Sequence, residues 1–362
     1  MILEVNKFYY PVIGGVETVV KQYAELLSKN EKVIVLCAKN YFSLFSNTKI
    51  INNIKVIRCS SFGTFFSMPL SIEFIIRFIY LSRKARIIHI HEPFPLSSVA
   101  SIFLPQRSKI FITWHSDIIR QKYLKLIVEF FQKLLCKKAE MIFATSKPLK
   151  FKSPLLKIFQ NKVKVLPLYI DPKKYLNVHI DNSLSKLFPK NYVLLFGRLS
   201  YYKGLSFFLK SICKIYDIPF LIVGDGEDKF KVLEFQKNRP NVLFINRHVS
   251  DIEKKDLIKN CKFLVLPSVY ESEAFGIIQI EAMIYSKPVI NTNLNTGVPW
   301  VSRHNVSGLT VPVNNTKKLS KAITLLYYDK ILYNRLSRGA YNRSLKLFSN
   351  KKNEIEILKY FS

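Results

Sequence analysis

The segment FLVLPSVYESEAFGIIQIEAM, residues Phe263–Met283, joins an apolar run to an amphipathic stretch through a short loop. The run Phe263–Leu266 predicts a buried β-strand that ends at Pro267, and the residues from Gly276 onward predict a helix. A strand that leads through a loop into a helix is the repeating unit of parallel α/β sheets. This segment therefore predicts an α/β fold.

The same alternation of short apolar runs and longer amphipathic segments extends along the chain. The expected strands are Ile2–Val5, Lys32–Ala38, Lys55–Cys59, Arg86–His91, Ile110–Trp114, Met141–Thr145, Val163–Leu166, Tyr192–Phe196, Phe220–Val223, Val242–Ile245, Phe263–Leu266, Pro288–Asn291 and Leu309–Val311. The expected helices are Glu17–Ser28, Ser71–Lys84, Ile119–Lys137, Pro148–Gln160, Leu205–Tyr216, Asp228–Asn238, Ile252–Asn260, Gly276–Tyr285 and Lys317–Tyr327.

A length of 362 residues suits two domains. The stretch Asp171–Lys190 loses strand character and gathers Pro, Asn and Ser, which is typical of a linker. We predict two Rossmann-like, doubly wound domains, residues 1–171 and 191–329, that are joined by a linker over 172–190 and face each other across a cleft. Residues 330–362 predict helices that pack back on the first domain.

The chain carries 56 Lys and Arg residues against 25 Asp and Glu residues, a formal net charge of +31. Such an excess attracts nucleic acid, anionic lipid headgroups or phosphorylated substrates, although a bias towards Lys, Asn and Ile can raise the charge without a function. The five dispersed cysteines fit neither a zinc framework nor a disulfide scaffold. Because no signal-peptide core and no apolar run of ~20 residues is present, we expect a cytoplasmic protein, soluble or peripheral to a membrane.

Two carboxylates of the opening segment, Glu273 and Glu281, lie eight residues apart. Between them, Phe275, Gly276 and Ile277 lie at the expected helix start, whose free N–H groups can hold an anion. Carboxylates accept hydrogen bonds from sugar hydroxyls, so the pattern suits a sugar nucleotide. A solvated helix start with acidic residues that favour the helix dipole would give the same spacing.

A basic pair follows the first expected strand of the second domain. Arg198 and Lys203, in FGRLSYYKG (Phe196–Gly204), are five residues apart and can converge on one pyrophosphate. There they would stabilise the negative charge of a departing nucleotide diphosphate. In so basic a chain the pair can also be incidental.

Other candidates follow strands in both halves. Gly14 and Gly15, in GGVE, allow the backbone to approach a ligand closely or simply to turn before a helix. Gly224 and Gly226, in VGDGE, are expected to shape a nucleotide base pocket by close backbone approach. His115 follows an apolar strand in WHSD, where Asp117 would orient it or cap the next helix. His89 and His91 have no metal-ligating partner beside them, which favours a supporting role over a metal site.

Together these motifs resemble glycosyltransferase family 4. The resemblance covers nearly the full chain and includes NTGVPWVSRHNVSGLTVPV (Asn295–Val313). It implies the GT-B fold, with residues 1–171 on the acceptor side and 191–329 binding the nucleotide sugar. It also implies a retaining hexosyltransferase of bacterial surface-polysaccharide or lipopolysaccharide synthesis, with a GDP-mannose-like or UDP-hexose donor.

The resemblance assigns roles to the candidates. Glu273 would hold the hexose hydroxyls, Glu281 the nucleotide ribose and His115 the transferred sugar. Arg198 and Lys203 would hold the diphosphate, whose leaving phosphate would help to deprotonate the acceptor, so that no enzymic nucleophile is needed. No D-x-D motif is present, so we expect neither a metal nor another cofactor. The predicted donor site is completed by Gly14, Gly15, Gly224, Phe275, Gly276 and Ile277.

Two segments predict contact with an anionic membrane, where a lipid-linked saccharide would be the acceptor at the inner face of the plasma membrane. A basic helix with an apolar face can lie on such a surface, although a core-facing stripe gives the same pattern. Ile119–Lys138 carries Arg120, Lys122, Lys125, Phe130, Phe131, Lys133, Lys137 and Lys138, and Ser61–Leu81 carries Phe62, Phe65, Phe66, Met68, Phe74 and Phe78.

Two alternatives come from other classes. A nucleotide-sugar epimerase can share two α/β domains and the same donor, but it would release a changed donor without any acceptor. A basic nucleic-acid-binding protein would interleave basic residues with stacking aromatics on one surface. The position of the motifs at the ends of strands favours a small-molecule site and no nucleic acid.

Overall fold

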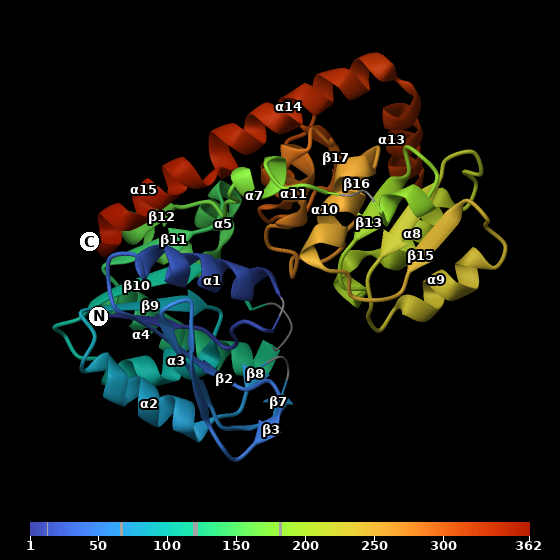
Figure 1. Cartoon of the computed structure of the whole chain (residues 1–362). Helices are drawn as coiled ribbons and strands as arrows, with labels where there is room; N and C mark the ends of the chain where they lie inside the picture. The colour runs from blue at the N-terminus through green and yellow to red at the C-terminus, as the bar shows by residue number, and fades with distance from the viewer. Residues whose placement is uncertain (13, 66–67, 119–121, 181–182) are drawn as a thin grey trace. The chain divides into compact units, whose positions relative to one another are not determined.

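The computed structural model describes residues 1–12, 14–65, 68–118, 122–180 and 183–362, which form two compact units (Figure 1). The first unit contains Met1–Leu166 together with Glu354–Ser362, and the second contains Pro167–Asn353. The stretch 172–190, predicted as a linker, thus belongs to the second unit. Of the predicted C-terminal helices, the final nine residues, Glu354–Ser362, group with the first unit.

The first unit is built on one eight-stranded sheet with the order β12-β11-β10-β9-β1-β2-β5-β4. All of its neighbouring strands are parallel except the β4–β5 hairpin at one edge. The strands of this sheet are β1 (Ile2–Val5), β2 (Val33–Ala38), β4 (Asn47–Ile51), β5 (Ile54–Cys59), β9 (Ile87–Glu92), β10 (Lys109–Trp114), β11 (Met141–Ala144) and β12 (Val163–Val165). Two further two-stranded sheets pair β3 (Phe42–Ser43) with β6 (Ser61–Phe62) and β7 (Thr64–Phe65) with β8 (Met68–Pro69).

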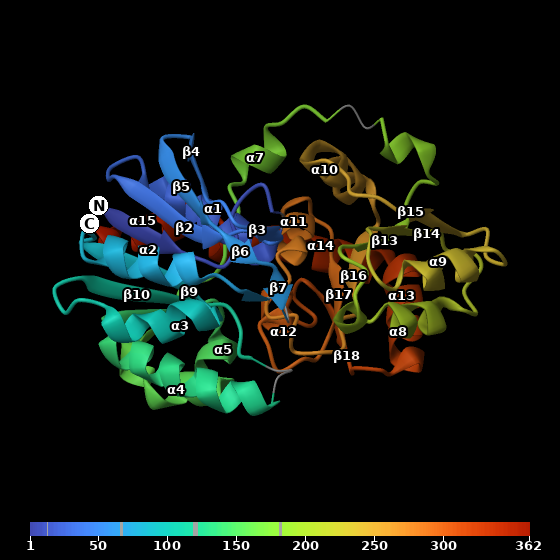
Figure 2. The ribbon, with the colours of Figure 1, turned by 90° about the horizontal axis from the view of Figure 1, so that it is seen from below.

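Helices cover both faces of this sheet: α1 and α15 lie on one face, and α2, α3 and α4 lie on the other (Figures 1 and 2). Alternation along the strands assigns the side chains to the two faces. Leu3 of β1 and Ile88 of β9 join one apolar core with Phe74 and Phe78 of α2. The helices are α1 (Gly15–Leu27), α2 (Ile72–Ser82), α3 (Pro95–Ala100), α4 (Lys122–Lys138), α5 (Lys147–Lys152), α6 (Pro154–Ile158) and α15 (Asn350–Phe361).

The opposite face of the first sheet is aromatic and partly polar. Phe111 and His89 lie on it, and the ring of Phe361 in α15 packs against both, with ring centroids 4.9 Å apart in each case. Tyr23 of α1 lies 4.9 Å from the ring of His89. The helix α15 thus covers part of this face of the sheet.

The second unit is a six-stranded sheet with the order β15-β14-β13-β16-β17-β18, and all of its neighbours are parallel. The strands are β13 (Val193–Phe196), β14 (Phe220–Val223), β15 (Val242–Ile245), β16 (Phe263–Leu266), β17 (Val289–Thr292) and β18 (Gly308–Val311). The helices are α7 (Lys173–Leu176), α8 (Leu205–Ile212), α9 (Lys229–Gln236), α10 (Asp251–Asn260), α11 (Ile278–Ile284), α12 (Val298–Val301), α13 (Thr316–Tyr328) and α14 (Lys330–Phe348).

Every strand predicted from the sequence is present, with bounds that agree to within one residue. The edge strand β4 was not predicted, because its side chains are mostly exposed and its apolar content is low. Its turn residues Asn52 and Asn53 both have positive φ, as a tight hairpin turn requires. The predicted helix Pro148–Gln160 is two helices, since Ser153 ends α5 and caps α6. Among the described residues no helix is long and apolar enough to cross a bilayer.

The stretch predicted as a linker is anchored by a buried carboxylate. Asp256 of α10 is only 1% exposed and accepts hydrogen bonds from the backbone N–H of Ser185 at 2.8 Å and from its hydroxyl at 2.6 Å. Asn260 donates a third at 2.8 Å. A linker with few apolar residues is therefore fixed by polar contacts that hydrophobic patterning does not reveal.

This anchor predicts a stability effect. Replacing Asp256 by Ala removes the acceptor of the two buried Ser185 donors and should lower the free energy of unfolding by about 2 kcal/mol. Asp251→Ala on the same helix, where the carboxylate is 84% exposed, should change it by less than about 0.5 kcal/mol. Denaturant unfolding measures the stability of both variants. The anchor would be contradicted if Asp256→Ala had wild-type stability and the Ser185 amide stayed protected from hydrogen exchange.

Candidate active site

The second sheet has its switch point between β13 and β16, the central neighbours from which the strand order runs outward in both directions. In parallel sheets the crevice beyond the carboxyl ends of such strands is where ligands bind. The loops that leave β13 and β16 carry Arg198 and Lys203 on one side and Glu273 on the other. A small hollow between them is lined by Leu195, Phe196, Gly197, Arg198, Lys203, Val265, Leu266 and Pro267.

An ion pair joins the two loops. Nζ of Lys203 lies 2.6 Å from Oε2 of Glu273, and both side chains are largely buried. The hydroxyl of Ser268 donates to the same oxygen at 3.1 Å. Burial lowers the pKa of Lys203, but the charge of Glu273, the nearby Tyr202 and the hydrogen bond to Glu273 together outweigh it and hold that pKa above its usual value. Two residues predicted to bind different parts of a donor are thus partners of each other in this structure.

Arg198 differs from Lys203 in its surroundings. Its side chain is exposed at the rim of the hollow. Within the described ranges no hydrogen bond or ion pair involves its guanidinium group. Five N–H donors are therefore available to a ligand in the hollow.

Two glycines hold the loops after β13 and β14 together. A Cβ on Gly224 would lie 2.0 Å from the carbonyl oxygen of Gly197, and one on Gly226 would lie 2.2 Å from that of Leu199. Both glycines have a large positive φ. Gly224 thus lies against the neighbouring loop and shapes the loop that carries Arg198, and its approach to a nucleotide base stays a prediction.

The start of α11 presents unpaired backbone donors. The helix begins at Ile278, two residues later than predicted, and Gly276 before it has φ +71°. No hydrogen bond within the described residues uses the N–H groups of Gly276, Ile277 or Ile278. The side chain of Phe275 packs against Trp300 and Phe348 in the core, so a contact of Phe275 with a donor would have to come from its backbone.

Glu281 is held by two partners that the sequence did not indicate. Its Oε1 accepts a hydrogen bond from the hydroxyl of Tyr175 at 2.8 Å and pairs with Nζ of Lys254 at 2.9 Å. Glu281 is 7% exposed. Tyr175 comes from the stretch predicted as a linker and Lys254 from the helix α10, and neither carries a motif.

The remaining predicted residues belong to the first unit. Gly14 precedes α1 and Gly15 begins it, and the carboxylate of Glu17 folds back over Gly14. His115 is 5% exposed, and its Nε2 lies 3.0 Å from Nδ1 of His91. Asp117 instead accepts hydrogen bonds from the Trp114 indole at 2.9 Å and from Ser153 at 2.7 Å. The residue that orients His115 is therefore His91 and not Asp117.

Two family models match the chain in succession. Glycosyltransferase Family 4 matches residues 13–174, and Glycosyl transferases group 1 matches residues 180–343. The two ranges adjoin near the boundary between the structural units. The chain belongs to glycosyltransferase family 4. The resemblance read from the motifs is thereby confirmed, and the enzyme is a glycosyltransferase.

Curated relatives of this glycosyltransferase include three bacterial sugar transferases. O-antigen chain mannosyltransferase C of Escherichia coli is 28% identical over 96% of this chain and 94% of its own length. D-rhamnosyltransferase WbpZ of Pseudomonas aeruginosa is 27% identical over 78% of this chain and 75% of its own. The N,N'-diacetylbacillosaminyl-diphospho-undecaprenol alpha-1,3-N-acetylgalactosaminyltransferase of Campylobacter jejuni is 28% identical over 53% of this chain and 52% of its own.

Solved structures confirm the fold of the glycosyltransferase. Sucrose-phosphate synthase from Thermosynechococcus elongatus superposes with a TM-score of 0.82 at 18% identity, over 99% of this chain and 98% of that one. Anabaena Alr3699/HepE in complex with UDP-glucose superposes with a TM-score of 0.75 at 14% identity, over 99% and 98%. The predicted GT-B class, two units with parallel sheets, is correct.

The ion pair in the hollow predicts a coupled stability effect. Lys203→Met leaves the Glu273 carboxylate largely buried without its counter-charge and should lower the free energy of unfolding by about 2 kcal/mol, and Glu273→Gln should act similarly. The double variant should lose clearly less than the sum of the two. Lys231→Met, which breaks an exposed pair with Asp228, serves as the control with an effect below about 0.5 kcal/mol. Strict additivity in denaturant unfolding would contradict the pairing.

Proposed function

We propose that this glycosyltransferase moves a hexose from a nucleotide-diphosphate sugar to a lipid-linked saccharide with retention of anomeric configuration. The observation that carries the proposal is that Arg198 and Lys203 line one hollow at the switch point of the second sheet and that Glu273 pairs with Lys203 there. Opposite charges at one strand-end crevice match the two halves of the donor, since the diphosphate is anionic and the hexose offers hydroxyl donors.

The ion pair gives a physical account of donor binding. Without donor, Lys203 neutralises Glu273 at 2.6 Å, which keeps a largely buried carboxylate stable. A bound diphosphate competes for Lys203, and Arg198 on the rim adds a bidentate contact. Glu273 is then released to accept hydrogen bonds from the hexose hydroxyls. As the bond to the sugar breaks, the same two cations stabilise the charge on the leaving phosphate, so metal-independent transfer is part of the proposal.

The relatives support a donor of this class. One of them is named as an O-antigen mannosyltransferase, and a structural neighbour is complexed with UDP-glucose. GDP-mannose and UDP-glucose are therefore the first donors to test, and assembly of a cell-surface polysaccharide is the proposed setting. The family assignment favours transfer over the epimerase and nucleic-acid-binding alternatives.

The acceptor is proposed to be lipid-linked, because a relative acts on a diphospho-undecaprenol saccharide by name and because α4 has an unusual surface. Leu126, Ile127 and Phe130 are each more than half exposed on it, and Lys133 and Lys137 are exposed further along. Exposed apolar residues with basic neighbours suit an anionic membrane surface. Of the residues predicted to contribute, Arg120 lies outside the described residues, as do the side chains of Lys122 and Lys125.

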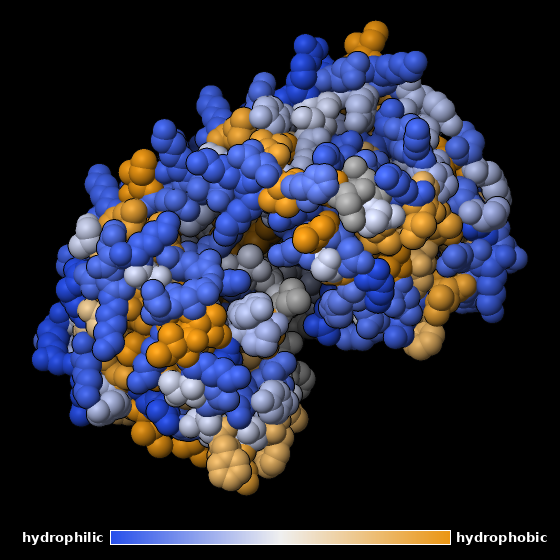
Figure 3. Space-filling model, in the orientation of Figure 1, coloured by the Kyte–Doolittle hydropathy of each residue, from blue (hydrophilic) through white to orange (hydrophobic). Residues whose placement is uncertain are grey.

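The second segment predicted to meet the membrane contributes only in part. Phe74 and Phe78 are fully buried core residues of the first unit, so their prediction as membrane contacts is wrong, because the helix α2 uses them to cover the sheet. Phe62 and Phe65 are exposed, as are Ile72 and Ile76 of α2. Figure 3 shows apolar side chains at the surface near β3 and α2, between hydrophilic ones. Phe66 lies outside the described residues.

The donor site is tested by removing both cations. The Arg198→Ala, Lys203→Ala double variant should transfer at least about a thousandfold more slowly with GDP-mannose or UDP-glucose, because the charge on the leaving group is no longer stabilised. Lys231→Ala, on the exposed face of α9, is the matched control and should transfer normally. Radiolabelled-sugar transfer to a lipid extract measures this, and near-normal transfer by a folded double variant would refute the assignment.

Membrane contact is tested by co-sedimentation with phosphatidylglycerol vesicles. Wild-type protein should bind at low salt and be released at high salt, and Leu126→Ser, Phe130→Ser should weaken binding about tenfold or more because buried apolar area is lost. Ile331→Ser, which alters an 84% exposed isoleucine in α14, should not weaken it. Equal binding to neutral and anionic vesicles would count against the proposal.

A further inference from the structure

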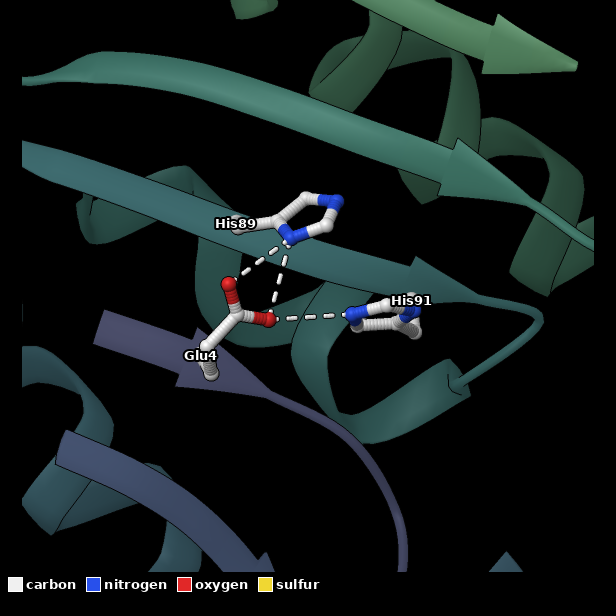
Figure 4. A group of neighbouring side chains, drawn as sticks. All are labelled: Glu4, His89 and His91. Carbon is white, nitrogen blue, oxygen red and sulfur yellow. Dashed lines mark hydrogen bonds and ion pairs between the residues drawn. The ribbon is translucent and has the colours of Figure 1, made fainter. Parts of the chain in front are cut away.

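A row of buried polar side chains crosses the sheet of the first unit at its own switch point, where β1 and β9 lie side by side. Nδ1 of His89 lies 3.0 Å from both carboxylate oxygens of Glu4, and Nε2 of His91 lies 3.0 Å from Oε2 (Figure 4). The three side chains are almost completely buried. A carboxylate with two imidazoles in a parallel sheet is not needed for the fold, because apolar residues would fill the same positions.

The row continues at both ends into β10. Nε2 of His89 lies 2.8 Å from the hydroxyl of Thr113, and Nδ1 of His91 lies 3.0 Å from Nε2 of His115. Strand register produces this arrangement, since Glu4 pairs with His89 and Thr113 pairs with His91. The row therefore ends at Thr113 on one side and, on the other, at His115, which is the histidine predicted to contact the transferred sugar.

The positions of the protons follow from the chemistry of the groups. Burial lowers the pKa of His89, His91 and His115 to about 3, so each imidazole is neutral near pH 7 and carries one N–H. Burial raises the pKa of Glu4, and the hydrogen bond and charge of His91 oppose that rise. An ionised Glu4 accepts from the ring nitrogens of both His89 and His91, whereas a protonated Glu4 would donate to one of them and so reverse its tautomer.

With Glu4 as the acceptor, each remaining position is determined. His91 donates from Nε2, so its Nδ1 carries a lone pair and accepts from the Nε2–H of His115. The Nδ1 of His115 is then left with a lone pair, and no hydrogen bond within the described residues uses it. A buried acid two strands away thus decides which nitrogen of His115 is an acceptor.

We propose that Glu4 and His91 are positioning residues that hold His115 in its Nε2–H tautomer, so that its Nδ1 accepts a hydrogen bond from a sugar hydroxyl. The proposal rests on the function assigned to His115 above. It also limits which ligand groups His115 can bind, because an Nδ1 without a proton accepts a hydrogen bond from a hydroxyl but cannot donate one to a phosphate or carboxylate. The carboxylate also fixes the orientation of the ring through His91.

A metal site would require the opposite proton arrangement. The ligand atoms of Glu4, His89 and His91 lie within 4.8 Å of one another, as metal ligands can. A metal bound there would need lone pairs on Nδ1 of His89 and Nε2 of His91, so His91 would carry its proton on Nδ1 and donate to His115. The two possibilities therefore predict different tautomers of His115.

The test is nitrogen-15 NMR of the full-length protein labelled at its histidines, at neutral pH, with resonances assigned by single histidine substitutions. We expect His115 as the neutral Nε2–H tautomer with a bare Nδ1. A proton on Nδ1 of His115, or stoichiometric binding of added Zn²⁺ with a change at His89 and His91, would overturn the proposal. If a substituted variant fails to fold, the wild-type histidine resonances are assigned through bonds instead.

A substitution at Glu4 tests whether Glu4 determines the tautomers of His91 and His115. Glu4→Leu removes both acceptor oxygens, so the proton of His91 should move from Nε2 to Nδ1 and the tautomer of His115 should change with it. Unchanged tautomers of His91 and His115 in this variant would overturn the role of Glu4. Thr113→Val is the matched control, since it removes an equally buried partner from the other end of the row and should leave His91 and His115 unchanged.

Activity tests the consequence for the reaction, with GDP-mannose or UDP-glucose as donor. His91→Asn keeps an oxygen acceptor near the position of Nδ1 and should retain kcat within about threefold, whereas His91→Leu removes the acceptor and should lower kcat at least about tenfold. Equal kcat in the two variants would contradict positioning. A His115→Ala variant that transfers at the wild-type rate would show that His115 has no role in transfer, and would leave the proton assignment intact.

Discussion

The ion pair between Lys203 and Glu273 is the interaction on which the second unit's chemistry depends. It joins the loops that leave two adjacent central strands, and it does so at the switch point, where a parallel sheet opens a crevice. Burying a single charge away from water is costly, and here each of the two charges is the counter-ion of the other, which offsets that cost. In the proposed donor complex the same pairing would give the site its selectivity, because the ligand would supply an anion for Lys203 and hydroxyl donors for Glu273 at once, as a sugar diphosphate can.

The first unit applies the same principle with hydrogen bonds in place of an ion pair. Its switch point holds Glu4 and His91, whose contacts run through the sheet to His115. In both units, groups that are expensive to bury are paired at the ends of central strands, where apolar residues would have been sufficient for stability. The aromatic rings of α15 complete the burial around this cluster, because Phe361 packs on His89. Residues of α15 therefore contribute to the surroundings of a cluster that β1 and β9 form.

Much of the fold was predictable from the sequence, because short apolar runs between loops indicate parallel strands, and every run predicted to be a strand became one. Arg198, Lys203 and Glu273 could be placed at strand ends on the same grounds. Hydrophobic pattern could not show that Lys203 and Glu273 pair with each other, that Tyr175 and Lys254 hold Glu281, or that Asp256 anchors Ser185, since these contacts join residues far apart in sequence. Glu4 illustrates the limit most clearly: in the sequence it only interrupts an apolar start, and its partners come from strand register.

The most direct test of the account is a structure determined from crystals of the full chain that have been soaked with GDP-mannose or UDP-glucose. The account predicts a diphosphate within hydrogen-bonding distance of Arg198 and Lys203, with Nζ of Lys203 moved away from Glu273 and the hexose hydroxyls on the freed carboxylate. A donor bound elsewhere in the chain, with the 2.6 Å pair between Lys203 and Glu273 intact, would contradict it.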